Sequence, residues 1–162
     1  GTPIPNVTDN IEWCNLLTTG AYCYYDNYYS NNAIYGKLYN WYAVGTGKLA
    51  PKGWHVPTDA EWETLITYLG GEDIAGGKMK STSFWESPNK GASNSSGFNG
   101  LPAGWRSDGV GDFFDIGEGS YFWSSTNWAK AWFCNLEFDN SEANRYDFRW
   151  KWSGFSVRCV RD

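Results

Sequence analysis

Few residues in this sequence could carry out covalent chemistry. His55 is the only histidine, so a serine or cysteine nucleophile activated by an imidazole would have to use it. It lies between Trp54 and Val56, directly before a predicted helix. We expect a hydrogen-bonded structural role, because a catalytic role requires supporting geometry. Aspartate and glutamate are plentiful, but no pair stands out. We therefore predict no catalytic residues, no cofactor and no enzyme.

The cysteines give no metal-binding pattern. They are Cys14, Cys23, Cys134 and Cys159. The absence of a Cys-x-x-Cys pair argues against a zinc site. Disulfides and free buried thiols both remain open. Cys159, between Val157 and Arg161 on a predicted strand, is expected to be a small buried apolar residue.

A glycine-rich stretch carries oxygen ligands of the kind that calcium prefers: Asp108, Asp112, Asp115 and Glu118. Their spacing does not match an EF-hand loop. A structural calcium ion there stays open, and we assign no metal-binding residue.

Aromatic residues are dense from Trp123 to Arg161. Side chains alternate at a period of two over 131–139 and 143–152, with a turn at Asn140-Ser141, and again over 154–161. This period predicts three strands whose successive side chains point to opposite faces. On the first strand we expect the core face to hold Trp132, Cys134, Leu136 and Phe138. The other face mixes aromatic and polar residues, as recognition surfaces do.

Two helices precede these strands. Helical spacing of Tyr35 and its neighbours predicts a helix over 35–44 that ends at Gly45. Thr58 and Glu61 form a predicted capping box, followed by a buried stripe of Trp62, Leu65, Ile66 and Leu69 and a stop at Gly70-Gly71. Residues 76–119 are predicted to be a long ordered loop region, anchored by scattered aromatics, in which 97–106 is either an ordered loop or a short strand. This pattern predicts an α+β fold, with residues 1–162 as a single domain.

Composition limits the partners. Aromatic residues make up 19% of the chain and the net charge is −5. This charge argues against nucleic acid and anionic membranes, which need a basic patch. No apolar run approaches the roughly 20 residues of a membrane span, so we expect no direct membrane insertion. The chain begins without methionine and without a signal peptide, so we expect a mature or excised piece of a longer protein.

Four motifs resemble those of a bacterial family. They are 35–44 (YGKLYNWYAV), 53–62 (GWHVPTDAEW), 123–126 (WSST) and 154–162 (GFSVRCVRD). Together they resemble the FISUMP major paralogous domain, which is similar to the formylglycine-generating type of C-type lectin fold. The resemblance implies two helices around a small twisted antiparallel sheet, long ordered loops and paired N- and C-terminal strands. It also implies a secreted or cell-surface protein.

The resemblance bears on three activities. Formylglycine-generating oxidases use two neighbouring C-terminal cysteines, and Cys159 has no such neighbour. The calcium- and sugar-binding tripeptides of true C-type lectins are absent as well. The aromatic-rich C-terminal stretch is similar to the variable proteins of diversity-generating retroelements, whose hypervariable positions lie on this fold.

The second strand allows two interpretations. In one, its aromatic face packs into the core and Arg145, Asp147, Arg149 and Lys151 face water, which alternation alone favours. In the other, Arg145 and Lys151 are scaffold positions shared with the family, with paired charges or packed stems, and the aromatics between them replace small polar residues. We favour the second interpretation, and expect an exposed face that binds a protein or a glycan. The predicted ligand-binding residues are Trp128, Phe133, Asn135, Glu137, Asp139, Asn144, Tyr146, Phe148, Trp150 and Trp152. A structural surface domain without a specific ligand is the alternative.

Overall fold

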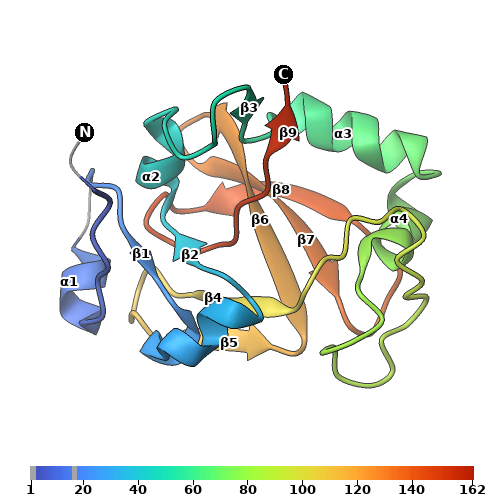
Figure 1. The fold of residues 1–162 in the computed structure, drawn as a ribbon, viewed down its shortest axis with the longest axis horizontal. Coiled ribbons are helices and arrows are strands. Elements are labelled where there is room, and N and C mark those ends of the chain that lie inside the picture. Colours follow the sequence, from blue (N-terminus) through green and yellow to red (C-terminus); the bar gives the residue numbers. More distant parts are fainter. Residues whose placement is uncertain (1–2, 16–17) are drawn as a thin grey trace.

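The computed structural model describes residues 3–15 and 18–162, which form a mixed α+β fold (Figure 1). The α-helices are α1 (Asn10–Cys14), α2 (Trp41–Gly45), α3 (Asp59–Tyr68) and α4 (Glu72–Met79). Two 3-10 helices are η1 (Tyr25–Asn27) and η2 (Tyr29–Ala33). The strands are β1 (Tyr22–Cys23), β2 (Leu38–Tyr39), β3 (Trp54–His55), β4 (Ala103–Arg106), β5 (Phe113–Ile116), β6 (Gly119–Asn127), β7 (Ala131–Glu137), β8 (Asn144–Arg149) and β9 (Val160–Arg161).

The main sheet has five strands in the order β5-β4-β6-β7-β8. Its neighbouring strands are antiparallel except for β4 and β6, which are parallel. Two short antiparallel pairs, β1-β2 and β3-β9, lie outside it. The implied pairing of N- and C-terminal strands is therefore wrong. The strand at the chain end, β9, instead lies beside β3 (Figure 1). In this pair Trp54 lies opposite Arg161.

Helix α3 confirms the predicted capping box. The Thr58 hydroxyl accepts a hydrogen bond from the Glu61 amide at 3.3 Å, and the Glu61 carboxylate accepts one from the Thr58 amide at 2.8 Å. Trp62 and Ile66 are buried on the inner side of the helix. Beyond it, Gly70 and its neighbour adopt positive φ, which ends the helix where the sequence predicted.

The helix predicted over 35–44 is wrong in its first half. Leu38–Tyr39 is a strand, and the helix begins only at Trp41, with the Asn40 side chain as its N-cap. Tyr39 exchanges two backbone hydrogen bonds with Phe155, at 2.7 and 3.0 Å. Those long-range bonds use the amide and carbonyl that a helix would have used internally. The predicted end at Gly45 is confirmed.

The stretch over 76–119 is more regular than the predicted loop. It holds the end of α4, then β4, β5 and the start of β6. The buried side of helix α4 consists mainly of alanine and glycine. Its sequence therefore lacks the regular spacing of large apolar residues that identifies a helix. A Cβ on Gly76 would clash with the Glu142 carbonyl, and the Gly77 amide donates to the Ser141 carbonyl at 3.0 Å. The two glycines let α4 approach the turn before β8.

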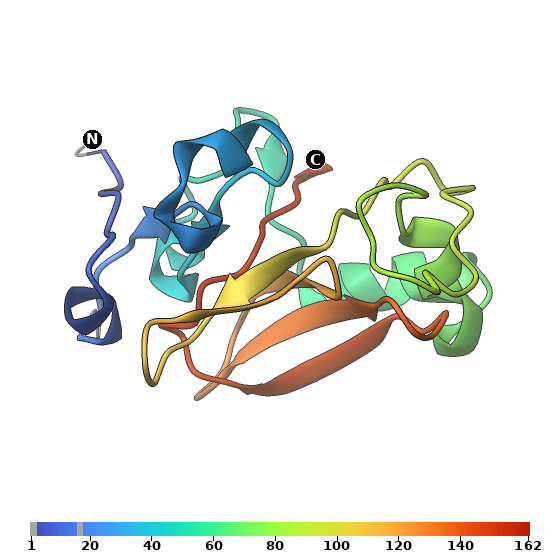
Figure 2. The same cartoon turned by 90° about the horizontal axis from the view of Figure 1, so that it is seen from below.

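Both faces of the central strands are covered. Under α3 and α4, one cluster includes Trp62, Phe122 and Leu136. On the opposite face, a second cluster includes Trp123, Phe133 and further residues. Strand β7 therefore has two buried faces. At the edge of the sheet, β8 lies beside β7, away from η1 and η2 (Figure 2).

Two buried cations fasten loops to this core. The Lys80 ammonium donates to the carbonyls of Lys90, Glu137 and Asn140 at 2.9, 2.8 and 2.7 Å. Burial lowers its pKa to about 8, and the charge of a nearby aspartate opposes the shift. Arg106 is also fully buried and donates to the carbonyls of the N-terminal segment. These bonds fix segments that have little regular structure of their own.

Candidate ligand-binding site

Strand register brings aromatic side chains together on one face of the sheet. Tyr146 of β8 lies opposite Phe133 of β7, and Tyr121 of β6 lies opposite Asn135. Directly opposite residues of antiparallel strands place their side chains on the same face. Phe133 of β7 and Tyr146 of β8 therefore lie on one continuous face of the hairpin. The predicted recognition face requires this arrangement.

A β-bulge changes the second half of β8. The pairs Phe133–Tyr146 and Ala131–Arg149 differ in register by one residue. An extra residue in β8 thus lies between Tyr146 and Arg149. Residues beyond the bulge are shifted by one, so Arg149 lies on the face of Tyr146. The predicted placement of Arg149 on the face of Arg145 is wrong for this reason.

A cavity of about 290 Å³ lies on this face. Phe133 is only 2% exposed and closes it from below, with its ring centroid 5.6 Å from that of Tyr146 and 5.5 Å from that of Phe148. Tyr146 and Phe148 are 37% and 50% exposed. The lining residues are Tyr121, Phe133, Asn135, Glu137, Tyr146, Phe148 and Arg149. Five of them are among the predicted ligand-binding residues.

The predicted exposure of Phe133 and Asn135 is wrong. They are 2% and 4% exposed, because loop residues such as Phe155 cover this face of β7. Cys134 belongs to the core, as predicted, and packs against the helices, so alternation places Phe133 on the opposite face of β7, which was expected to be exposed. A second core on the other face buries it nevertheless. Both side chains contribute to the cavity from below.

Asp115 holds two aromatic rings behind the cavity. Its carboxylate accepts from the Tyr121 hydroxyl and from the Trp105 indole, each at 2.7 Å. Burial, with the Asp115 hydrogen bond and charge, raises the pKa of Tyr121 far above its usual range, so the phenol stays protonated. Asp115 is thus occupied as an acceptor. Among the described residues, no cluster of three potential ligands could hold a metal ion.

Two charged side chains line the cavity without an ionic partner. The Arg149 guanidinium lies 4.1 Å from the centroid of the Trp105 ring, and its buried Nε has no hydrogen-bond partner among the described residues. Glu137 is half-buried, and burial raises its pKa, although the Asn135 side chain opposes the shift. Neither group forms a salt bridge within the described part of the chain.

None of the three predicted tryptophans lines the cavity. Trp128 is 69% exposed and lines a neighbouring hollow of about 350 Å³ with Phe148. Trp150 and Trp152 stack with centroids 5.1 Å apart and planes 8° apart, in the turn after β8. The predicted strand over 143–152 is thus shorter than expected, because the chain turns after Arg149.

The remaining predicted residues do not line this cavity. Asp139 lies in the turn after β7 and accepts from the Asn140 side chain at 3.1 Å. Asn144 donates to Glu142 at 2.9 Å.

Arg145 of β8 and Lys151 of the following turn contact neighbouring elements. Arg145 pairs with Asp59 of α3 at 2.6 Å, and both side chains are largely buried. Lys151 donates to Asn127 at 2.8 Å, with its ammonium 4.5 Å from the centroid of the Trp41 ring. The prediction of a paired charge is confirmed for Arg145, whereas Lys151 has no anionic partner among the described residues and contacts Asn127 and the Trp41 ring instead.

A family comparison matches nearly the whole chain. The model of the Fibrobacter succinogenes major domain matches residues 1–161. The chain belongs to this family. The match confirms the FISUMP resemblance drawn from the four motifs. Comparison with curated proteins found no match, and comparison with solved structures found none either.

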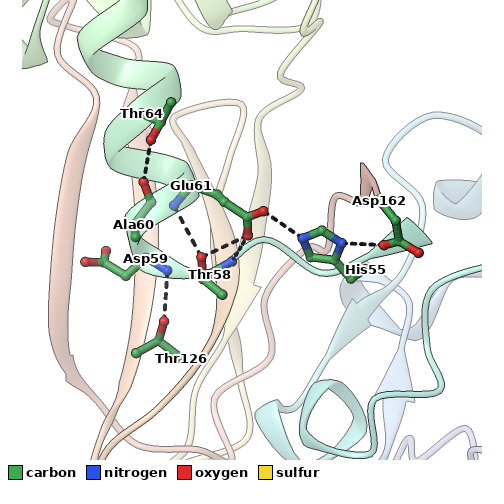
Figure 3. Close-up of polar contacts among 8 residues, drawn as sticks. All are labelled: His55, Thr58, Asp59, Ala60, Glu61, Thr64, Thr126 and Asp162. Carbon is green, nitrogen blue, oxygen red and sulfur yellow. Dashed lines mark hydrogen bonds and ion pairs between the residues drawn. The ribbon is translucent and has the colours of Figure 1, made fainter. Parts of the chain in front are cut away.

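His55 bridges two parts of this family domain (Figure 3). Its Nδ1 lies 2.7 Å from an Asp162 carboxylate oxygen, and its Nε2 lies 2.8 Å from Glu61. Hydrogen bonds to Asp162 and then Glu61 raise the pKa of His55. Burial tends to raise the pKa of Glu61, but hydrogen bonds from Thr58 and His55 outweigh it and lower the pKa. The predicted structural role of His55 agrees with these contacts.

The cysteines are free thiols in this domain. Burial raises the pKa of Cys23 and of Cys134 to about 12, so both stay protonated. Burial also raises the pKa of Cys159, which packs against the cluster that contains Phe133. A thiolate nucleophile is disfavoured at all three positions.

The sequence analysis did not predict two residues that line the cavity, Tyr121 and Arg149. Tyr121 precedes Trp123 at a spacing of two, and this spacing alone could have placed it on the same strand face. Arg149 gave no such signal. The β-bulge places its side chain on the cavity face, and the alternation of the sequence does not reveal a bulge. Within the described ranges, no helix has the length and apolar character to cross a bilayer.

Proposed function

We propose that this domain is a non-catalytic ligand-binding module, secreted or displayed at a bacterial surface, on a C-type lectin-like scaffold. Its site is the cavity beside β8 together with the exposed rings around it. The ligand is a protein or a glycan. The oxidase alternative lacks support because Cys159 has no neighbouring cysteine in the sequence.

The cavity lining carries this proposal. Partly exposed Tyr146 and Phe148 stand over a buried Phe133, with Arg149 and Glu137 unpaired beside them. Recognition sites combine rigid aromatic area with a few polar groups that fix orientation. A structural surface domain has no need of two charges without partners in a half-buried cavity.

Arrayed glycans and arrayed folded proteins, probed with the labelled domain, test the proposal. We expect the wild-type domain and Tyr68→Ser to bind the same ligand, since Tyr68 on α3 is 85% exposed and distant in sequence from the site. The double variant Tyr146→Ser/Phe148→Ser is expected to bind at least about tenfold more weakly, since hot-spot aromatics contribute more than about 1.4 kcal/mol.

An unchanged affinity in the double variant would place recognition elsewhere. Absence of any ligand on both arrays would instead favour the structural surface domain. A circular dichroism spectrum of each variant checks that the fold is retained.

We also propose that this domain is a variable protein of a diversity-generating retroelement. Three exposed aromatics support this proposal: Phe148 in the cavity lining, Trp128 in the turn before β7 and Trp150 directly after β8. Sequencing many copies of the gene from one population tests it. Substitutions should concentrate at these positions and spare Arg145 and Phe133, and an even spread would contradict it.

A further inference from the structure

The polar groups of the cavity specify the chemistry of its ligand. The buried Nε of Arg149 has no hydrogen-bond partner among the described residues, and its guanidinium forms no salt bridge with them. Glu137 offers acceptors from the opposite strand. Both charges lie near Tyr121: burial and Asp115 account for most of the rise in its pKa, Glu137 adds to the rise and Arg149 opposes it. The cavity thus presents one cation and one carboxylate around an aromatic base.

The Arg149 guanidinium is held in place for an anion. It lies over the Trp105 ring, and its central carbon is also 5.5 Å from the centroid of the Phe148 ring. Trp105 is itself fixed by its hydrogen bond to Asp115. A guanidinium positioned by stacking keeps its planar donor fork, which matches a carboxylate. An anionic group is therefore the best-matched partner for this end of the cavity.

Glu137 limits the kind of anion. Its half-buried carboxylate has no cationic partner among the described residues and interacts with the Asn135 side chain, so its remaining acceptor positions favour a ligand that brings hydrogen-bond donors. The carboxylate side chain of an acidic peptide would satisfy Arg149, but only backbone N–H groups next to it could donate to Glu137. A sugar acid brings a carboxylate and several hydroxyl donors on one ring. Its C–H face can also pack on the exposed rings of Tyr146 and Phe148.

The size of the cavity agrees with one sugar ring. Its volume of about 290 Å³ lies just below the range of about 300–1,000 Å³ that is typical of sites for drug-sized molecules, so it suits a smaller group. We propose that the cavity binds a uronic acid residue of an acidic glycan. The sugar carboxylate lies on Arg149, and hydroxyls donate to Glu137. This inference rests on the proposed function and names its ligand class.

Two sugars that differ only at C6 test it. The ¹⁵N-labelled wild-type domain is titrated with methyl glucuronide and with methyl glucoside, and amide shifts are followed by NMR. We expect the glucuronide to shift amides of β7 and β8, and to bind about tenfold or more tightly than the glucoside, since hydrogen bonds to charged groups are the stronger ones. This comparison uses the wild-type protein, so it does not depend on the folding of any variant.

Variants then assign the contacts. Arg149→Gln should abolish the preference for the glucuronide, whereas Glu137→Gln should weaken both sugars to a similar extent. Tyr68→Ser should bind both as the wild type does. Acetyl-aspartate amide, an acidic peptide mimic, should shift the same amides only weakly.

Several results would overturn the proposal. These are no shift with the glucuronide, equal affinity for the two sugars, an unchanged preference in Arg149→Gln, or stronger binding of the aspartate mimic. The last result would identify an acidic protein as the ligand. In each of these cases, weaker array binding by Tyr146→Ser/Phe148→Ser would still support the proposed ligand-binding function. The array experiment therefore distinguishes failure of the uronic acid proposal from failure of the proposed function.

Discussion

Replacing Phe133 with alanine tests whether the residue under the cavity belongs to the core. Phe133 is 2% exposed, and its ring contacts include Phe155 at 5.0 Å and Phe148 at 5.5 Å. Deleting a buried phenylalanine ring costs about 3–5 kcal/mol of unfolding free energy. The aromatic pairs add to this cost beyond area alone, so we expect a loss of about 4 kcal/mol.

Two matched variants calibrate this number. Phe148→Ala removes the same ring from a side chain that is 50% exposed, so about half the burial, or about 2 kcal/mol, should be lost. Phe133→Leu keeps most of the volume and should cost less than about 1.5 kcal/mol. The expected order of stability is therefore Phe133→Leu, then Phe148→Ala, then Phe133→Ala.

Urea unfolding monitored by far-ultraviolet circular dichroism measures the three differences. Unchanged m-values are required, because they show that the same surface is exposed on unfolding in each variant. A cost for Phe133→Ala below that of Phe148→Ala would refute the second core on this face of β7. Phe133 would then be an exposed residue that could contact the ligand directly.

Three further predictions concern the turn after β8, the histidine bridge and the buried lysine. Because Trp150 is 48% exposed and Trp152 half-buried, replacing both with serine should cost about 2 kcal/mol for each ring, or about 4 kcal/mol together, in urea unfolding. A loss of about 6–10 kcal/mol, as for two core aromatics, would place them in the core. The raised pKa of His55 contributes stability that is complete below the ordinary value of 6.5 and is lost as pH rises through the raised pKa. The urea midpoint should therefore fall between pH 6 and pH 8.5, and His55→Gln should reduce this fall; an equal fall in both proteins contradicts the bridge. Lys80→Met removes three hydrogen bonds from a charged donor and should cost about 2–4 kcal/mol in the same assay, whereas a neutral result would show that those carbonyls need no partner.

The sequence predicted the elements whose signals are local. The capping box of α3 needs only Thr58 and Glu61, three residues apart, and the stop needs only the glycine pair that follows. The strand over 131–139 was found by its alternation, and is observed as Ala131–Glu137. The same alternation named Tyr146 and Phe148, which line the cavity. Whether they bind a ligand remains a prediction.

The tertiary structure decided what local signals could not. Alternation shows which residues share a face of a strand, but whether a second layer covers that face depends on segments far along the chain. Phe155 and its neighbours cover Phe133, so a predicted exposed residue is core. Likewise, Tyr39 is a strand residue because Phe155 supplies its hydrogen bonds.

The cavity itself depends on a feature without a sequence signature. One extra residue in β8 moves Arg149 to the aromatic face, and a period-two count cannot register a bulge. The sequence by itself determined the family, the α+β class and the aromatic content of the hairpin. Only the tertiary structure determined which of those rings are exposed and which charges lie beside them, because burial and register are set by partners distant in the chain.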